Sequence, residues 1–142
     1  MSDSERTGAT PLVARWCLGA IAVFMLPVGM QATLTPRSFF DDFPLGRSWV
    51  AADGALYNEH LVRDVGVLFV ALVIAAAWTG WRRVGDQAVA VAWLVQGLAH
   101  VAFHAAHLRG LGAVDQLGLL VSLAIVPVAA GAALFVTRAE PR

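Results

Sequence analysis

The chain has 142 residues, of which 58% are hydrophobic and only 14% are charged. Water-soluble domains of this length need far more polar surface, so the composition excludes an ordinary soluble domain. The formal net charge is zero, which gives no indication of a nucleic-acid partner. The single cysteine, Cys17, has no second cysteine for a disulfide and falls in an apolar stretch, where a buried thiol is the ordinary expectation.

Four apolar stretches are each long enough to cross a bilayer as a helix, which takes about 20 residues. They cover about residues 13–30, 61–78, 88–108 and 113–136. The first is long and has a flank of mixed charge, so we interpret it as a retained helix and not as a signal peptide. Because short loops force neighbouring helices to run antiparallel, the sequence predicts an all-α integral membrane protein, a four-transmembrane-helix up-and-down bundle. We expect one membrane domain over residues 12–137, a disordered segment before it (1–11) and a short tail after it (138–142).

Arginine is distributed unevenly between the two ends of these helices. Six arginines lie in the N-terminal segment, in the loop between the second and third helices and in the tail: Arg6, Arg15, Arg82, Arg83, Arg138 and Arg142. The opposite side has four arginines, which are diluted by six acidic residues. The positive-inside rule therefore predicts that both termini are cytoplasmic. Trp78 and Trp81 fit an interfacial belt on the same side.

The only long connection covers about residues 31–60. Within it, Thr35 suits an N-cap and Pro36 suits the first position of a short helix that ends before the next proline. This helix would place three phenylalanines (39, 40 and 43) on one side and Asp41 and Asp42 on the other, as in an amphipathic helix lying on the outer membrane surface. Trp49 would be a further interfacial anchor.

Four polar side chains follow one face of the third apolar helix. They are Gln96, His100, His104 and His107, and at 100° per residue they fall within about 80°. Trp93 lies beside this stripe, whereas the opposite face is aliphatic. Polar groups inside a membrane are expensive to expose to lipid, so the stripe is predicted to face the bundle interior or a polar cavity.

The second apolar helix begins with the string YNEHLVRDVG, residues 57–66. Asn58 suits an N-cap, and the pairs Glu59–Arg63 and His60–Asp64 are each four residues apart, so both pairs can form along the helix. This helix starts on the outer side and the third helix ends there. We therefore expect all four histidines to collect in the outer third of the bundle, with the two helices facing each other.

Histidines four residues apart on a helix have a common metal-ligand spacing, and carboxylates complete such sites for zinc, copper or iron. The predicted metal ligands are His60, His100, His104 and Asp64. The residues predicted to orient these ligands or to contact a bound molecule are Glu59, Arg63, His107, Gln96, Trp93 and Asn58. A bis-histidine haem is the weaker alternative, because His60 lies so close to the helix end.

This cluster leaves three kinds of function open. The first is an outward-facing pocket that binds a metal ion or a small hydrophobic ligand, either a lipid or a quinone. The second is a membrane enzyme that performs acid–base or redox chemistry on a lipid-like substrate. The third is an accessory subunit of a membrane redox complex, whose outer loop docks a membrane partner. Assembly as a homo-oligomer is compatible with all three.

Several strings carry a family resemblance: DDFP (residues 41–44), Trp49, YNEHLVRDVG (57–66) and the histidines of residues 100–107. With its four spans and outer first loop, the chain resembles the DoxX-like superfamily of small four-helix bacterial membrane proteins, and within it the actinobacterial branch. The resemblance covers about residues 12–136 and implies the fold. Named members are linked to quinone-coupled sulfur oxidation or to redox stress complexes, but no catalytic residue set carries over to this chain.

Overall fold

The computed structural model describes residues 12–82 and 84–139. They form five helices: α1 (Leu12–Leu34), α2 (Pro36–Asp42), α3 (Glu59–Arg82), α4 (Asp86–Ala106) and α5 (Ala113–Ala139). The described ranges contain no strand, and α1, α3, α4 and α5 are long and apolar enough to cross a membrane. The predicted fold class is therefore confirmed. The predictions for residues 1–11 and for most of the tail fall outside the described residues.

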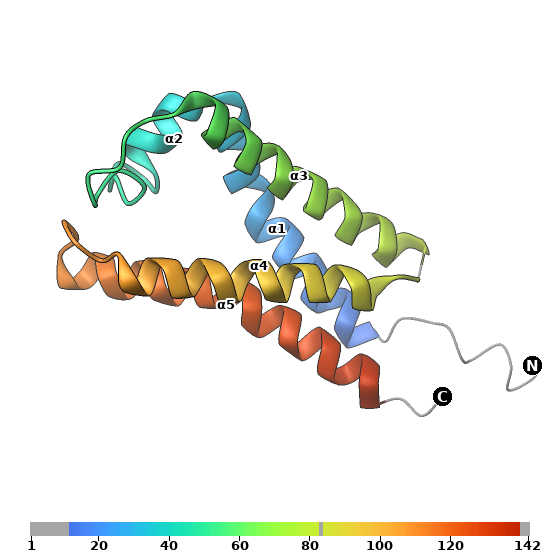
Figure 1. The fold of residues 1–142 in the computed structure, drawn as a ribbon. Coiled ribbons are helices and arrows are strands. Elements are labelled where there is room, and N and C mark those ends of the chain that lie inside the picture. The colour runs from blue at the N-terminus through green and yellow to red at the C-terminus, as the bar shows by residue number, and fades with distance from the viewer. Residues whose placement is uncertain (1–11, 83, 140–142) are drawn as a thin grey trace, which may run out of the picture.

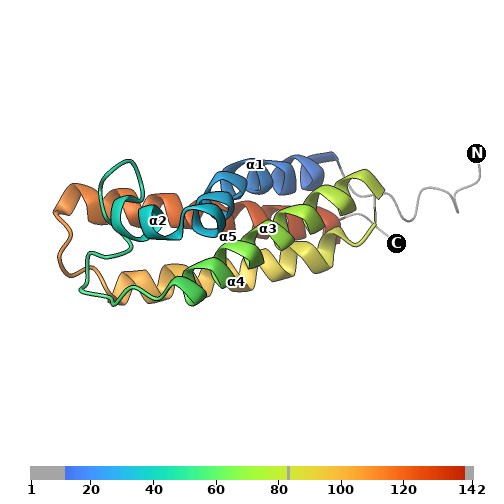
Figure 2. The same ribbon diagram turned by 90° about the horizontal axis from the view of Figure 1, so that it is seen from above.

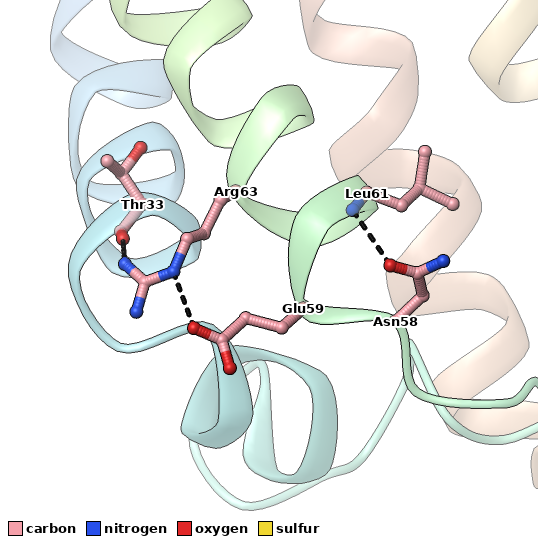
Figure 3. Close-up of polar contacts among 5 residues, drawn as sticks. All are labelled: Thr33, Asn58, Glu59, Leu61 and Arg63. Carbon is pink, nitrogen blue, oxygen red and sulfur yellow. Dashed lines mark hydrogen bonds and ion pairs between the residues drawn. The ribbon is translucent and has the colours of Figure 1, made fainter.

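The helix ends around the long connection follow largely from local sequence. Pro36 occupies the first turn of α2, where its missing N–H needs no partner. Asn58 caps α3 as predicted, because its Oδ1 accepts a hydrogen bond from the backbone N–H of Leu61 at 3.1 Å (Figure 3). Thr35 precedes α2 but does not cap it with its side chain; its hydroxyl donates to the carbonyl of Gln31 at 3.1 Å, back onto α1.

The four long helices form two antiparallel pairs, α1 with α3 and α4 with α5, and contacts between α1 and α5 join the pairs. Helices α3 and α4 leave their short connection together and then diverge (Figure 1). The wider end holds α2 and the loop of residues 43–58, beside the turn from α4 to α5 (Figure 2). We call this the α2 end. The other end is the termini end, because α1 begins and α5 ends there.

Two close backbone approaches hold the helices of each pair together. A Cβ atom added at Gly66 of α3 would lie 2.6 Å from both N and Oγ1 of Thr33 on α1. A Cβ atom added at Gly97 of α4 would lie 2.7 Å from Cδ of Pro127 on α5. Real side chains do not tolerate such distances, so glycine permits both contacts.

The hydrophobic core lies between the two pairs and toward the termini end. Leu18 and Ile21 of α1 and Trp93 of α4 are fully buried. Phe69 of α3 stacks on Trp93 with ring centroids 6.3 Å apart, so this contact joins two helices that otherwise touch little. Beyond Phe69 toward the α2 end, the pairs have separated and the space between them becomes a cavity.

Candidate functional site

A cavity of about 400 Å³ lies at the α2 end, lined by side chains from all five helices and from the loop of residues 43–58. Most of its walls are apolar. Helix α1 contributes Phe24, Met25 and Val28, and most of the side chains that α5 contributes are aliphatic. Small-molecule sites in proteins have this character, a mostly apolar concavity with a few placed polar groups.

The polar groups of the cavity are concentrated on α4. The stripe predicted from helical periodicity lines one wall: Gln96, His100, His104 and His107. The rings of His100 and His104 meet edge to face with centroids 4.7 Å apart. The ring of His107 stacks on Phe103 at 4.2 Å, and its Nδ1 lies 2.7 Å from the carbonyl oxygen of Phe103. Three imidazoles therefore follow one another from the middle of the cavity to its rim.

Helix α3 presents a different face to the cavity from the one expected. Its lining side chains are Asn58 and the apolar group Leu61, Val62, Val65 and Phe69. His60 and Asp64 form the predicted pair, with Nε2 and Oδ2 3.2 Å apart, but they do not line the cavity and their side chains are 87% and 61% exposed. At 100° per residue, positions 60 and 64 point away from positions 58, 62 and 65. The expected facing of His60 and Asp64 toward the α4 histidines is therefore corrected.

The second predicted pair of α3 is also present and has a packing role. Arg63 Nε donates to Glu59 Oε1 at 2.8 Å (Figure 3). The same guanidinium donates through Nη1 to the backbone carbonyl of Thr33, in the last turn of α1. The last carbonyls of a helix have no partner within it and attract cations. Arg63 and Glu59 thus tie the start of α3 to the end of α1, outside the cavity.

The predicted metal ligands are not brought together. In the part of the chain that the structure describes, no group of three or more His, Cys, Asp or Glu side chains lies in a position to hold a metal ion. His100 and His104 line the cavity, whereas His60 and Asp64 lie on the surface of α3. The same displacement removes His60 as the partner of a bis-histidine haem. The cause is the rotational position of α3, which is set by its packing against α1.

Helix α2 and the loop after it form a roof over the cavity. Phe39 and Phe40 are only 9% and 8% exposed and line the cavity, so the apolar face of α2 packs on the bundle and not on a membrane surface. The acidic face is outside, as predicted. Asp41 accepts from Arg37 Nε at 2.6 Å, and Asp42 accepts from Ser38 Oγ at 3.1 Å.

Trp49 anchors this roof to the protein, and its role as an interfacial membrane anchor stays a prediction. It is half-buried, lines the cavity and donates from Nε1 to Oδ1 of Asp115 in the first turn of α5 at 2.9 Å. Arg47 Nη1 reaches the same carboxylate oxygen at 2.5 Å. One carboxylate at a helix start therefore fixes two side chains of the loop, and the partial positive charge of that helix end favours it there.

Tyr57 closes the roof beside the start of α3. Its ring meets Phe40 edge to face at 5.3 Å, and the guanidinium of Arg37 lies 4.8 Å from its centroid. Its hydroxyl is buried without a hydrogen-bond partner among the described residues. Burial, followed by the charge of Glu59, raises the pKa of the Tyr57 phenol, which therefore stays neutral at physiological pH.

Three sets of residues line the cavity although the sequence did not predict them there. Ser122 of α5 lines it and donates its hydroxyl to the carbonyl of Leu119 at 2.8 Å, which leaves the hydroxyl oxygen able to accept. Asp53 is exposed and lines the same cavity as His104. The phenylalanines of α2 were identified as an apolar face, but not as a cavity wall. Only they gave a signal in the sequence, since Ser122 and Asp53 are isolated polar residues.

Trp93 lies behind the polar wall and not in it. Its side chain is fully buried, does not line the cavity, and its indole N–H has no hydrogen-bond partner among the described residues. The predicted site residues therefore divide into three groups. One lines the cavity (Gln96, His100, His104, His107, Asn58 and Trp49), one lies outside it (Glu59, His60, Arg63, Asp64, Asp41 and Asp42), and Trp93 belongs to the core.

Comparison of the chain with protein-family models, with curated proteins and with solved structures found no match. The resemblance to the DoxX-like superfamily accordingly stays a prediction. The structure itself leads to one conclusion about the site: a membrane-type helical bundle holds a roofed, mainly apolar cavity with one polar wall.

Proposed function

We propose that this protein binds a small hydrophobic molecule carrying a polar group, of the lipid or quinone type, in the cavity at the α2 end. One observation carries the proposal: the apolar cavity has its imidazoles on a single wall. Apolar walls favour a hydrophobic body, and a one-sided polar wall orients a molecule that has hydrogen-bonding groups at one position.

The size of the cavity limits the ligand. A water molecule takes up about 30 Å³ in the liquid, so a cavity of about 400 Å³ has room for on the order of a dozen water-sized groups. This corresponds to one substituted ring, or to the head and first carbons of a longer amphiphile. A complete two-chain lipid does not fit inside it.

The polar wall offers both donors and acceptors. A neutral imidazole donates from one ring nitrogen and accepts at the other, so His100 and His104 can each bind a carbonyl or a hydroxyl oxygen. Ser122 accepts from the α5 side, and Asn58 lines the cavity beside the start of α3. A ligand that carries a hydroxyl as well as a carbonyl oxygen can therefore be contacted from more than one helix.

In this proposal the α2 end faces the outside of a bacterial plasma membrane, and the termini end faces the cytoplasm. The arginine distribution of the short segments supports this orientation. The ligand then enters from the outer leaflet or the external medium. Protease access to the loop of residues 43–58 in intact cells tests the orientation.

A membrane enzyme using acid–base chemistry is the second candidate. The specific observation in its favour is that a carboxylate, Asp53, lines the same cavity as His104. A histidine assisted by a carboxylate is a common general-base arrangement. Turnover of the bound compound by the purified protein, with loss of turnover in His104→Gln but retained binding, separates this candidate from a binding protein.

The test of binding is mass spectrometry of the organic extract from protein purified in mild detergent. Wild type is compared with the double variant His100→Ala/His104→Ala and with His60→Ala, which removes the same side chain outside the cavity. We expect one enriched apolar compound in wild type and His60→Ala. The double variant should retain at least about tenfold less, because each lost hydrogen bond costs about 1 kcal/mol.

Two results would contradict the proposal. The first is an extract in which no compound is enriched over the lipid that surrounds any membrane protein in detergent. The second is equal retention by the double variant while its melting temperature matches wild type. Reduced retention by His60→Ala would instead place the site on the surface of α3.

A further inference from the structure

A second cavity, of about 300 Å³, lies at the termini end between α1 and α3. Its lining residues are Leu12, Arg15, Trp16 and Gly19 from α1, and Ala76, Ala77 and Gly80 from α3. None of them lines the cavity at the α2 end. The two cavities are therefore separate, and the proposed function does not use this one.

The described residues of α3 that line this groove are all glycine or alanine. A Cβ atom added at Gly19 or at Gly80 would meet no side chain or neighbouring helix of the described residues within 4 Å. These glycines thus differ from Gly66 and Gly97, whose missing side chains are replaced by a neighbouring helix. The groove therefore contains a narrow space beside Gly19 and Gly80, which we call the slot and which no described side chain occupies. It lies along two helices that are long enough to span a membrane.

Arg15 gives the slot its charge. The Nε atom of this guanidinium is buried without a hydrogen-bond partner among the described residues. The side chain as a whole is only partly buried, but a buried N–H group without a partner is costly, and the hydrocarbon of a membrane provides no water to compensate for it. Arg15 is the fourth residue of α1, which places it roughly 5 Å along the axis from the helix start, at the depth of the lipid head groups.

Arg15 therefore favours an anion, and the apolar slot favours an apolar chain attached to that anion. We propose that the groove binds the phosphate of an anionic phospholipid through Arg15, with part of an acyl chain in the slot beside Gly19 and Gly80. Guanidinium groups bind phosphate through two parallel hydrogen bonds, and basic pockets between transmembrane helices hold lipid head groups. Trp16 is 71% exposed beside Arg15 and suits the boundary between head groups and hydrocarbon.

The groove also indicates which head group is preferred. Among the residues that the structure describes, Arg15 is the only charged one that lines the groove, and none of them contributes an acidic side chain to it. A head group with net negative charge, such as phosphatidylglycerol, satisfies Arg15. A head group that adds a cation, such as phosphatidylcholine, gains nothing from a wall without carboxylates. The α1 dipole, positive at this end, favours the anion further.

Native mass spectrometry of the full chain in detergent tests this proposal, with phosphatidylglycerol, phosphatidylcholine or inorganic phosphate added separately. We expect wild type to retain phosphatidylglycerol in preference to phosphatidylcholine. Arg15→Gln should weaken its retention at least about tenfold, and Arg15→Lys should weaken it less, because lysine keeps the charge but loses the paired hydrogen bonds.

A second variant tests the slot without touching the charge. Gly80→Leu fills open space, so it should fold and should lower phosphatidylglycerol retention. The matched controls are Gly131→Leu, at another helical glycine with no atom within 4 Å of an added Cβ, and Arg109→Gln, which removes an exposed arginine from the turn at the α2 end. Both controls should bind as wild type does.

Three outcomes would overturn the proposal. They are unchanged phosphatidylglycerol binding in both Arg15→Gln and Gly80→Leu, equal retention of the two lipids, and full displacement of phosphatidylglycerol by inorganic phosphate. The last result would assign Arg15 to a soluble phosphate instead of a lipid. Because the variants lie at the termini end, all of these outcomes are independent of ligand binding at the α2 end.

Discussion

Helices α3 and α4 carry similar polar groups near the same end of the molecule, but these groups have opposite surroundings. His100 and His104 on α4 line the cavity. His60 and Asp64 on α3 have the same spacing of four residues and lie on the protein surface. The spacing fixes that two side chains share a face of a helix, but it does not fix which neighbour that face meets.

The neighbours differ because the helices are held by different close contacts. Gly66 presses α3 against Thr33 of α1, and this contact turns the apolar side of α3 toward the cavity. Gly97 presses α4 against Pro127 of α5, and this contact leaves the polar stripe of α4 facing inward. The rotation of each helix about its own axis therefore decides which polar groups can act together.

The largest expected effect on stability comes from removing the contact between Trp93 of α4 and Phe69 of α3. Trp93→Ala deletes a fully buried indole stacked on Phe69 and should lower the free energy of unfolding by about 3–5 kcal/mol. Thermal unfolding in detergent measures it. Trp78→Ala is the control, because that side chain is 55% exposed and should have a much smaller effect. Equal losses in the two variants would show that the pairs are not held by the Trp93 contact.

The close contacts within each pair should give the next largest effect. Gly66→Ala and Gly97→Ala each place a methyl group against a neighbouring helix and should cost about 1–3 kcal/mol. Gly131→Ala is the matched control, since its Cβ has open space and alanine favours a helix by about 1 kcal/mol over glycine. Unfolding of the three variants in the same detergent, monitored by circular dichroism, compares them. Tolerance of both packed substitutions would remove our explanation of the helix rotation.

A smaller effect is expected for the roof over the cavity. Trp49→Phe keeps an aromatic ring but removes the hydrogen bond to Asp115, which should cost about 1 kcal/mol. The loss of stability should be confined to the loop, so the substitution should accelerate hydrogen exchange in residues 45–56 more than in α4. Trp81→Phe, at the termini end, serves as control because it is 77% exposed. If exchange in the loop is unchanged, Arg47 alone fixes the roof to α5.

The smallest effect is expected for the exposed pair of His60 and Asp64 on α3. His60→Ala removes one partner of an exposed pair and should change the unfolding free energy by less than about 0.5 kcal/mol. Urea or detergent titration of unfolding is sensitive enough to exclude a larger value. A loss above about 1 kcal/mol, roughly twice this upper value, would mean that the surface of α3 is covered by another chain.

Local sequence predicted much of the architecture and one wall of the site. The four long helices, the Pro36 start of α2, the Asn58 cap and both charged pairs of α3 are all present. They depend on hydropathy and on contacts within four residues, which a single segment contains. The polar stripe of α4 could be found in the same way, because helical periodicity places its members on one face.

The remaining parts of the site depend on distant segments. Asp115 holds Trp49 from 66 residues away, and no local pattern connects them. The burial of Phe39 in the roof depends on a cavity that α2 does not itself form. We expected His60 and Asp64 to meet the α4 histidines because all of these residues lie at a similar depth in the membrane. Depth gives the position of a residue along the helix axis, but it does not give the direction in which the side chain points around that axis.

By itself, the sequence determined how many helices are long and apolar enough to cross a membrane, where they lie along the chain to within about a turn, and which polar residues share a face. These properties follow from the preference of each segment for lipid, for water and for helical hydrogen bonds. Only the tertiary structure decided which faces meet, because that depends on where two backbones can approach most closely. At Gly66 and Gly97 those approaches place the histidines of α4 inside a cavity and leave the histidine of α3 outside it.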